Sequence, residues 1–255
     1  MPAGLFKSLP DMVTTFFCIT KKKEHVMKIK DLVDTDHPLV IEKAEELTGH
    51  IDGDAERVAS IFNYVRDGIT FAFPCGGDLV AASETIKSAR GQCNTKGTLF
   101  LALCRAAGIE ARLHFSSIKK EIQRGLFTGL MYRLMPDEIS HSWIEVKLEG
   151  RWHRIDAYIN DFDFYQKGKS ALAARNWDTG FSISCSAGSS TADLDFEDEG
   201  FVQMDAVVKD HGIHEPEDYF ASELYLNRPG FFKLFIYRLV VGRINRRVEK
   251  MRSSE

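Results

Sequence analysis

The stretch from residue 91 to residue 108, GQCNTKGTLFLALCRAAG, constrains the fold more than any other part of the chain. Its apolar residues are too dense for a helix that is exposed on one side, and Gly108 is a typical helix stop. These apolar residues are Leu99, Phe100, Leu101, Ala102, Leu103, Ala106 and Ala107. The stretch therefore predicts a mostly buried helix that begins near Cys93.

Cys93 is the candidate nucleophile, because it lies at the first turn of this helix. Unpaired backbone N–H groups and the positive end of the helix dipole favour an anion there. The pKa of a cysteine falls below about 8.5 at such positions, and the thiolate is the reactive form. A buried, inert cysteine is the alternative. That alternative suits Cys104, in mid-helix among apolar residues, better than Cys93, which lies between the polar Gln92 and Asn94.

The composition is that of a soluble globular protein, and we expect a single domain over residues 1–255. The hydrophobic content is 44%, the charged content 27% and the net charge −4. A negative net charge, without arginines and aromatic residues interleaved along a strand, argues against a nucleic-acid partner.

The cysteines indicate neither a metal site nor a disulfide framework. There are five, an odd number, widely spread and without zinc-ligand spacing. We therefore expect no metal, no cofactor and a reducing compartment. The apolar run at 12–19 is too short to span a membrane, and lysines follow it instead of preceding it. These features predict a cytoplasmic protein.

Periodicity places the elements on either side of the cysteine helix. Apolar residues recur at three- and four-residue intervals in 38–47 and in 54–65, which predicts two amphipathic helices. Residues 68–74 are β-prone, and a short helix over 81–89 leads to the cysteine. Alternation over 109–115 predicts a core strand directly after the buried helix.

Residues 116–137 interrupt the predicted sheet. The segment is long for a connection within a compact domain, and such segments often form lids or pocket walls. A peripheral helix that covers the sheet is the alternative, and the sequence leaves both open.

The clearest hairpin joins residues 140–148 to residues 151–158 through a turn at 149–150. If the turn is centred there, the numbers of opposite residues add up to 299, so that Glu145 faces Arg154.

This register places His141 opposite Tyr158 and Trp143 opposite Asp156. Residues two apart share a face of a strand, so all four side chains lie on one side of the hairpin. Diagonal neighbours on such a face are about 7–8 Å apart, close enough for an imidazole and a carboxylate to meet. A slip of one residue would move Asp156 to the other face.

The C-terminal part is divided by charge. Between residues 193 and 223 there are eleven Asp and Glu and one Lys, whereas 230–255 is basic. Residues 231–251 read as a terminal helix that is apolar nearly all round. Such a helix is covered by the domain, by a second subunit in a homo-oligomer, or by a membrane surface.

The residues singled out above could perform thiol acyl chemistry together. Cys93 would attack a carbonyl, His141 would hold the proton, and Asp156 would fix the imidazole tautomer. Backbone N–H groups at the helix start could stabilise the oxyanion. The candidates for the oxyanion site and substrate pocket are Gln92, Asn94, Trp143 and Tyr158.

The chain resembles the transglutaminase-like cysteine enzymes in an ordered set of motifs. The motifs are GQC at 91–93, RAAGIEAR at 105–112, HSWIEV at 141–146 and WHRID at 152–156. The resemblance implies a papain-like α+β fold in which the catalytic helix packs on an antiparallel sheet. It also implies that Cys93, His141 and Asp156 are the catalytic triad. It covers residues 38–160 as a core, with an N-terminal segment 1–37 and a C-terminal extension 161–255.

The expected function is therefore acyl transfer through an acyl-cysteine, from an amide, ester or thioester carbonyl of a peptide, protein or small molecule. Family members hydrolyse the intermediate or pass it to an amine, and some have lost catalysis. A catalytically silent module that binds a protein or peptide is the alternative.

Overall fold

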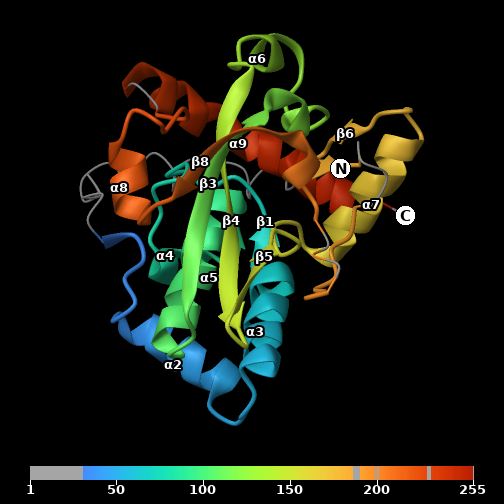
Figure 1. The fold of residues 1–255 in the computed structure, drawn as a ribbon. Helices are drawn as coiled ribbons and strands as arrows, with labels where there is room; N and C mark the ends of the chain where they lie inside the picture. Colours follow the sequence, from blue (N-terminus) through green and yellow to red (C-terminus); the bar gives the residue numbers. More distant parts are fainter. Residues whose placement is uncertain (1–30, 186–189, 198, 200, 229–230, 255) are drawn as a thin grey trace, which may run out of the picture.

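A computed structural model describes residues 31–185, 190–197, 199, 201–228 and 231–254 (Figure 1). Of the N-terminal segment, only residues 31–37 belong to this part. The expectations for residues 1–30, including the apolar run at 12–19, lie outside the described residues.

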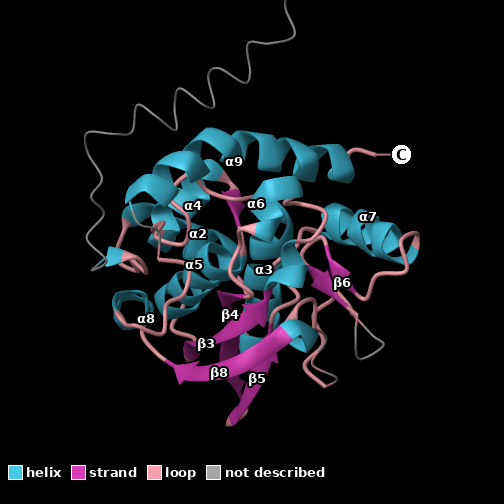
Figure 2. Cartoon of the chain, turned by 90° about the horizontal axis from the view of Figure 1, so that it is seen from above, coloured by secondary structure: helices cyan, strands magenta, loops and turns pink. Residues whose placement is uncertain are grey.

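A four-stranded antiparallel sheet in the order β5-β4-β3-β8 forms one layer of the molecule. Its strands are β3 Ala111–Lys119, β4 Glu138–Leu148, β5 Arg151–Ile155 and β8 Val207–Ile213. Helices cover one face of the sheet, and Figure 2 shows the two layers edge-on. The predicted α+β class, with helices packed on an antiparallel sheet, is confirmed.

The helical layer follows the predicted order. Its helices are α2 Pro38–Thr48, α3 Asp54–Asn63, α4 Ala82–Ser88 and α5 Cys93–Ala106. The short elements around them are η3 Tyr64–Gly68, β1 Thr70–Phe71 and β2 Arg90–Gly91. Outside the sheet, the elements between β3 and the terminal helix are η4 Lys120–Gln123, α6 Gly129–Arg133, α7 Phe162–Ala173, β6 Thr179–Gly180, β7 Ile183–Ser184, η5 Met204–Ala206 and α8 Pro216–Ala221.

Helix α5 is buried and begins at Cys93, as predicted. Gln92 caps it, because the Gln92 side chain accepts from the N–H of Asn94 while the Thr95 hydroxyl accepts from the N–H of Gln92. All residues from Asn94 to Cys104 are buried. After the helix, Gly108 has a φ of 73°, which a side chain would strain.

The hairpin register is confirmed from Ile144 to Leu148, where opposite residue numbers add up to 299. The turn residues Glu149 and Gly150 both have positive φ, 49° and 81°. The predicted second strand is too long, however, because β5 ends at Ile155 and the pairs His141–Tyr158 and Trp143–Asp156 are not formed.

Segment 116–137 also differs from the prediction. Strand β3 continues to Lys119, so the sheet is interrupted four residues later than expected. The rest of the segment contains η4 and the short helix α6.

The terminal helix α9, Phe231–Arg252, is covered by the domain on one side. Val241, Ile244 and Val248 are buried, and Asn245 binds the main chain of Phe73. The helix is not covered all round. Phe235, Ile236 and Leu239 are 40–47% exposed. Among the described residues, no helix is both long and apolar enough to cross a membrane.

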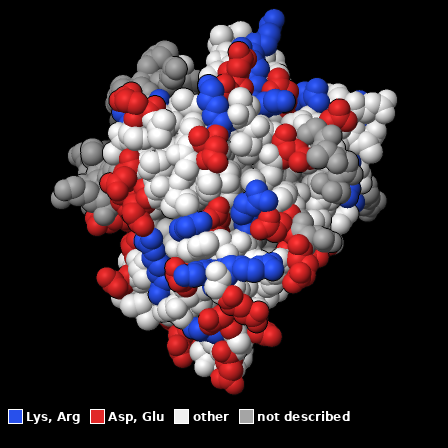
Figure 3. Space-filling view, in the orientation of Figure 1, with Lys and Arg blue, Asp and Glu red and all other residues white. Residues whose placement is uncertain are grey.

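The uncovered face of the sheet carries charges of both signs, which Figure 3 shows over the face in view. Ion pairs there join β3 to β4, β5 to the loop at 199, and β8 to β4. They are Arg112–Glu145, Arg154–Glu199 and Lys209–Glu138.

Candidate active site

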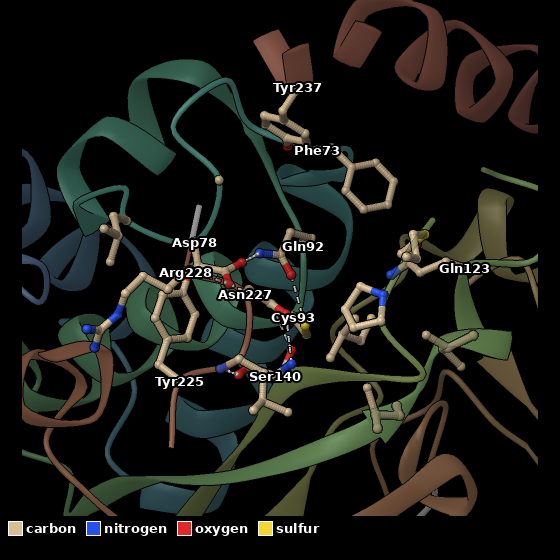
Figure 4. Close-up of a pocket in the computed structure, with 18 of the residues that line it drawn as sticks. Phe73, Asp78, Gln92, Cys93, Gln123, Ser140, Tyr225, Asn227, Arg228 and Tyr237 are labelled. Carbon is tan, nitrogen blue, oxygen red and sulfur yellow. Dashed lines mark hydrogen bonds between the residues drawn. The ribbon is translucent and has the colours of Figure 1, made fainter. Parts of the chain in front are cut away.

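Cys93 lies at the start of α5 beside a side chain that holds its proton (Figure 4). Its Sγ donates to Gln92 Oε1 at 2.8 Å, and the amide nitrogen of Gln92 donates to Asp78. Asp78 therefore fixes the Gln92 amide with its oxygen toward the thiol. In this arrangement the Gln92 N–H groups point away from the thiol. They are therefore not positioned to donate to an oxyanion formed at Cys93, which is the role expected of this side chain.

Asp78 also connects the nucleophile to the C-terminal part of the chain. Its second oxygen accepts from Tyr225 Oη at 2.9 Å and from Asn227 Nδ2 at 2.8 Å. Asn227 Oδ1 in turn accepts from the N–H of Ser140 in β4 at 2.9 Å. A buried network thus joins the loop before α4, the start of α5, strand β4 and the loop after α8.

A cavity of about 290 Å³ opens beside Cys93 and Gln92. Its walls come from the loop 73–79, from the segment after β3, from β4 and from the C-terminal region. The members of segment 116–137 that line it are Ile118, Ile122, Gln123, Phe127, Met135 and Pro136. Of the two alternatives for this segment, the structure shows a pocket wall.

His141 lies on β4, fully buried, and does not line this cavity. Its neighbour Ser142 donates to Asn94 Oδ1 at 2.9 Å, so the Ser142 side chain faces α5, whereas the side chain of His141 shares the other face of β4 with Ile139, which lines the cavity. Neither ring nitrogen has a hydrogen-bond partner among the described residues. Burial lowers the pKa of His141 to about 3, which keeps the imidazole neutral.

Asp156 is fully buried just beyond β5. Its carboxylate accepts from the N–H groups of Val202, Gln203 and Met204 at 2.6, 2.7 and 3.1 Å. Burial raises the pKa of Asp156 to about 7, although these three bonds act in the other direction. The bonds also explain why β5 ends early, since they hold Asp156 against segment 202–204 instead of the sheet.

Trp143 and Tyr158, which were expected at the substrate pocket, are not among the residues that line this cavity. Trp143 stacks on His114 with 4.2 Å between ring centroids. Tyr158 packs edge-on against Phe100, and its buried hydroxyl has no hydrogen-bond partner in the described part of the chain. Asn94 is buried and binds Ser142, so Gln92 alone among these four candidates lines the cavity.

The thiol of Cys93 is not activated in this arrangement. Burial raises its pKa, and the negative charges of Asp78 and, more weakly, Asp156 add to the effect. The N–H groups of Asn94 and Ser142 oppose it without cancelling it. The expected lowering of the pKa at the helix start is therefore wrong for this state, because desolvation outweighs the helix dipole.

Lys96 is a buried cation that the sequence analysis missed. Its Nζ donates to the carbonyl oxygens of Arg66 at 3.1 Å and Ile159 at 2.9 Å. Burial lowers the pKa of Lys96 to about 7. Lys96 is the only charged residue between Cys93 and Cys104, and a single charge within an apolar helix is the sequence feature that could have identified it. Lys96 ties α5 to the loop that follows Asp156.

The network residues Asp78, Ser140, Tyr225 and Asn227 were also missed. They are distant from Cys93 in sequence and belong to no recognisable motif, so only the fold brings them together. In the part of the chain that the structure describes, no three His, Cys, Asp or Glu side chains cluster so that they could hold a metal ion.

The cysteines divide into two kinds. Cys93, Cys104 and Cys185 are free thiols, whereas Cys75 is disulfide-bonded. A disulfide is unusual in a reducing compartment, so the cytoplasmic localisation stays a prediction.

Residues 41–157 match the family profile of the transglutaminase-like superfamily. No curated protein matches the chain.

Among solved structures, a protein of Cytophaga hutchinsonii, provisionally described as a cysteine protease, is 22% identical with a TM-score of 0.40, over 51% of this chain and 39% of that one. A provisionally described protease of Parabacteroides distasonis is 14% identical with a TM-score of 0.37, over 58% of this chain and 26% of that one. A third structure, described as a TGase, is 16% identical with a TM-score of 0.35, over 65% of this chain and 42% of that one. This chain thus spans less than half of each of these proteins.

Proposed function

Residues 41–157 form a transglutaminase-like superfamily domain, and from this premise we propose that the chain is a cysteine-dependent acyl-transfer enzyme. The observation that carries the proposal is the position of Cys93. It is a free thiol at the start of a buried helix, and it lines a cavity of about 290 Å³.

In the proposed reaction, Cys93 Sγ forms a bond to a substrate carbonyl carbon and the bond to the leaving group breaks. The thiol proton passes to His141, whose neutral imidazole has a free acceptor nitrogen, and from there to the leaving group. Asp156 would orient the imidazole. The N–H groups of Asn94 and Ser142, which interact with Sγ, are candidates to bind the oxyanion.

Substrate binding would complete this arrangement. His141 has no hydrogen-bond partner in the described residues, and catalytic hydrogen bonds are often loose in the absence of substrate. The raised pKa of Cys93 means that the thiol loses its proton during attack instead of resting as a thiolate.

A silent binding module is the second candidate, and the contacts of Asp156 favour it. The Asp156 carboxylate accepts from three backbone N–H groups, which is the arrangement of a structural aspartate. A partner would then occupy the cavity without chemistry.

A pre-steady-state assay with p-nitrophenyl butyrate distinguishes the two candidates. The enzyme should release a burst of about one p-nitrophenolate per chain, and Cys93→Ser should abolish it. Cys185→Ala is the matched control, because Cys185 is a free thiol that does not line the cavity. If the burst is absent, or equal in the Cys93→Ser variant, the chain is not the proposed enzyme.

The same assay with a primary amine separates hydrolysis from transfer. Transfer to an amine requires a site that excludes water and positions the acceptor. Formation of the amide at millimolar amine would identify a transferase, and free acid as the only product would identify a hydrolase.

A further inference from the structure

The cavity beside Cys93 has two different sides. On one side, the polar groups are already paired with each other. Asp78 accepts from Gln92, Tyr225 and Asn227, and Asn227 is paired with both the N–H and the carbonyl oxygen of Ser140. This polar side has therefore little hydrogen-bonding capacity left for a ligand.

The other side is a largely apolar wall with one polar member, Gln123, whose buried Oε1 has no hydrogen-bond partner among the described residues. Phe73 and Phe127 meet edge to face with 5.2 Å between ring centroids, and Ile118 and Ile122 are each only 1% exposed. Ile139 packs against these two isoleucines, and Met135 lines the same cavity. In Figure 4, Phe73 and Tyr237 lie on one side of Cys93, away from Asn227 and Ser140.

Charge recognition is also missing from the described lining. The only charged residues there are Asp78 and Arg228. Asp78 is held in the buried network. Arg228 donates through Nη2 to the carbonyl oxygens of Ala221 at 2.8 Å and Ser222 at 2.7 Å, and its Nη1 lies 3.8 Å from Glu223, so its guanidinium is directed to the end of α8. A charged acyl group would lose its hydration here without gaining a partner.

We propose that the acyl donor of this enzyme carries an uncharged, apolar acyl group, aliphatic or aromatic, which packs between Phe73, Ile122 and Phe127 while its carbonyl carbon lies at Cys93. The inference rests on the proposed function and names its substrate class. A volume of about 290 Å³ is near the lower end of the roughly 300–1,000 Å³ of small-molecule sites. The cavity therefore suits a short or medium acyl chain.

Acylation of Cys93 requires only the thiol and the acyl donor. The Sγ–acyl bond forms, the bond from the carbonyl to its oxygen, sulfur or nitrogen leaving group breaks, and the thiol proton goes to that leaving group. Water or an amine then attacks the thioester and returns one proton to Cys93.

A series of p-nitrophenyl esters tests the inference. The acetate, butyrate, hexanoate and octanoate are compared below their micelle concentrations, with the rate of Cys93 acylation as the readout. The rate constant kcat/KM should rise with length, by up to about fourfold for each methylene that becomes buried, and then level off. The mono-p-nitrophenyl ester of glutaric acid, a charged analogue of the pentanoate, should react at least tenfold more slowly than the pentanoate.

Two cavity variants should change the length profile in opposite directions. Ile122→Phe should slow the octanoate more than the acetate, and Phe127→Ala should shift the optimum to a longer chain. Val208→Phe is the matched control, because Val208 is 42% exposed on β8 and does not line the cavity. If Ile122→Phe fails to fold, Phe127→Ala still decides the question.

The outcomes separate the two proposals. Acylation of Cys93 at the same rate by all esters, including the charged one, would overturn the apolar acyl group and leave the enzyme proposal standing. No acylation by any ester would overturn both.

Discussion

At the scale of single residues, the site holds its reactive groups neutral. The Cys93 thiol has a raised pKa, and the pKa of His141 is lowered to about 3, both chiefly because the side chains are buried. Asp78 is the charge that contributes most to the raised pKa of Cys93. The negative network that positions Gln92 therefore also keeps the thiol protonated.

Removing the charge of Asp78 should make Cys93 more reactive. Asp78→Asn lowers the pKa of the thiol, so alkylation by iodoacetamide at pH 7.5 should be faster and its pH profile should move to lower pH. Asp163→Asn, an exposed change, is the control. An unchanged profile in Asp78→Asn would mean that this charge does not act on the thiol.

Asp156→Asn tests both roles of this carboxylate. An amide cannot accept from three N–H groups as a carboxylate does, so we expect a loss of about 1–3 kcal/mol in the free energy of unfolding. If Asp156 also orients His141, the acylation rate per folded molecule should fall, by up to about 10⁴-fold as in serine proteases. A stability loss with an unchanged rate per folded molecule would assign Asp156 a structural role alone.

Asp161 is unsuitable as a control for Asp156. It caps α7, accepts from the N–H of Phe71 at 2.8 Å and pairs with Arg252 at 2.7 Å. The exposed Asp163 remains the better comparison.

At the scale of elements, one buried ion pair fastens the terminal helix to the domain. The side chains of Arg252 and Asp161 are 14% and 6% exposed. Arg252→Met should lower the free energy of unfolding by about 3 kcal/mol or more, because Asp161 would remain buried without its cation. Urea denaturation measures this loss, and Arg243→Met, an exposed change on the same helix, should cost less than about 0.5 kcal/mol. Similar losses in both variants would contradict the role of the pair.

Three strands of the sheet are linked through His114. Its Nδ1 lies 2.8 Å from Glu145 on β4, and its Nε2 lies 2.6 Å from Asp210 on β8. Burial alone would lower the pKa of His114, but the bonds to the two carboxylates outweigh it and raise the pKa.

This link gives stability a defined pH dependence. Because the folded-state pKa is raised, the contribution is complete below about pH 6.5 and is lost as the pH rises through the folded value. The difference in unfolding free energy between the wild type and His114→Gln should therefore be larger at pH 6 than at pH 9. His153→Gln is the control, since His153 bonds a main-chain carbonyl and not a carboxylate. A difference that is constant with pH would contradict the link.

At the scale of the whole molecule, local patterns predicted the elements and missed the contacts between distant segments. The apolar run after Cys93 and the hairpin turn at Glu149–Gly150 were sufficient to place α5 and the register of β4 and β5. The early end of β5 was not predictable, because it depends on the N–H groups of segment 202–204. The raised pKa of Cys93 was equally hidden, since it follows from burial and from Asp78.

The terminal helix illustrates the same limit. Its apolar content indicated a covered helix, and the structure shows that residues near its C-terminal end pack on the domain while Phe235, Ile236 and Leu239 remain partly exposed. The density of apolar residues identified the helix, but the partner that covers it is set by tertiary contacts such as Asp161 with Arg252.

The most direct test of the central claim is to find the acyl group on Cys93. The protein is mixed with p-nitrophenyl butyrate, quenched in acid within one turnover and digested with trypsin for mass spectrometry. Trypsin places Cys93 in the peptide 91–96 and Cys104 in the peptide 97–105, so the two thiols are read separately. We predict a butyryl group on 91–96 that disappears with turnover and fails to form in His141→Ala. An unmodified 91–96 peptide, or equal labelling of 97–105, would contradict the account.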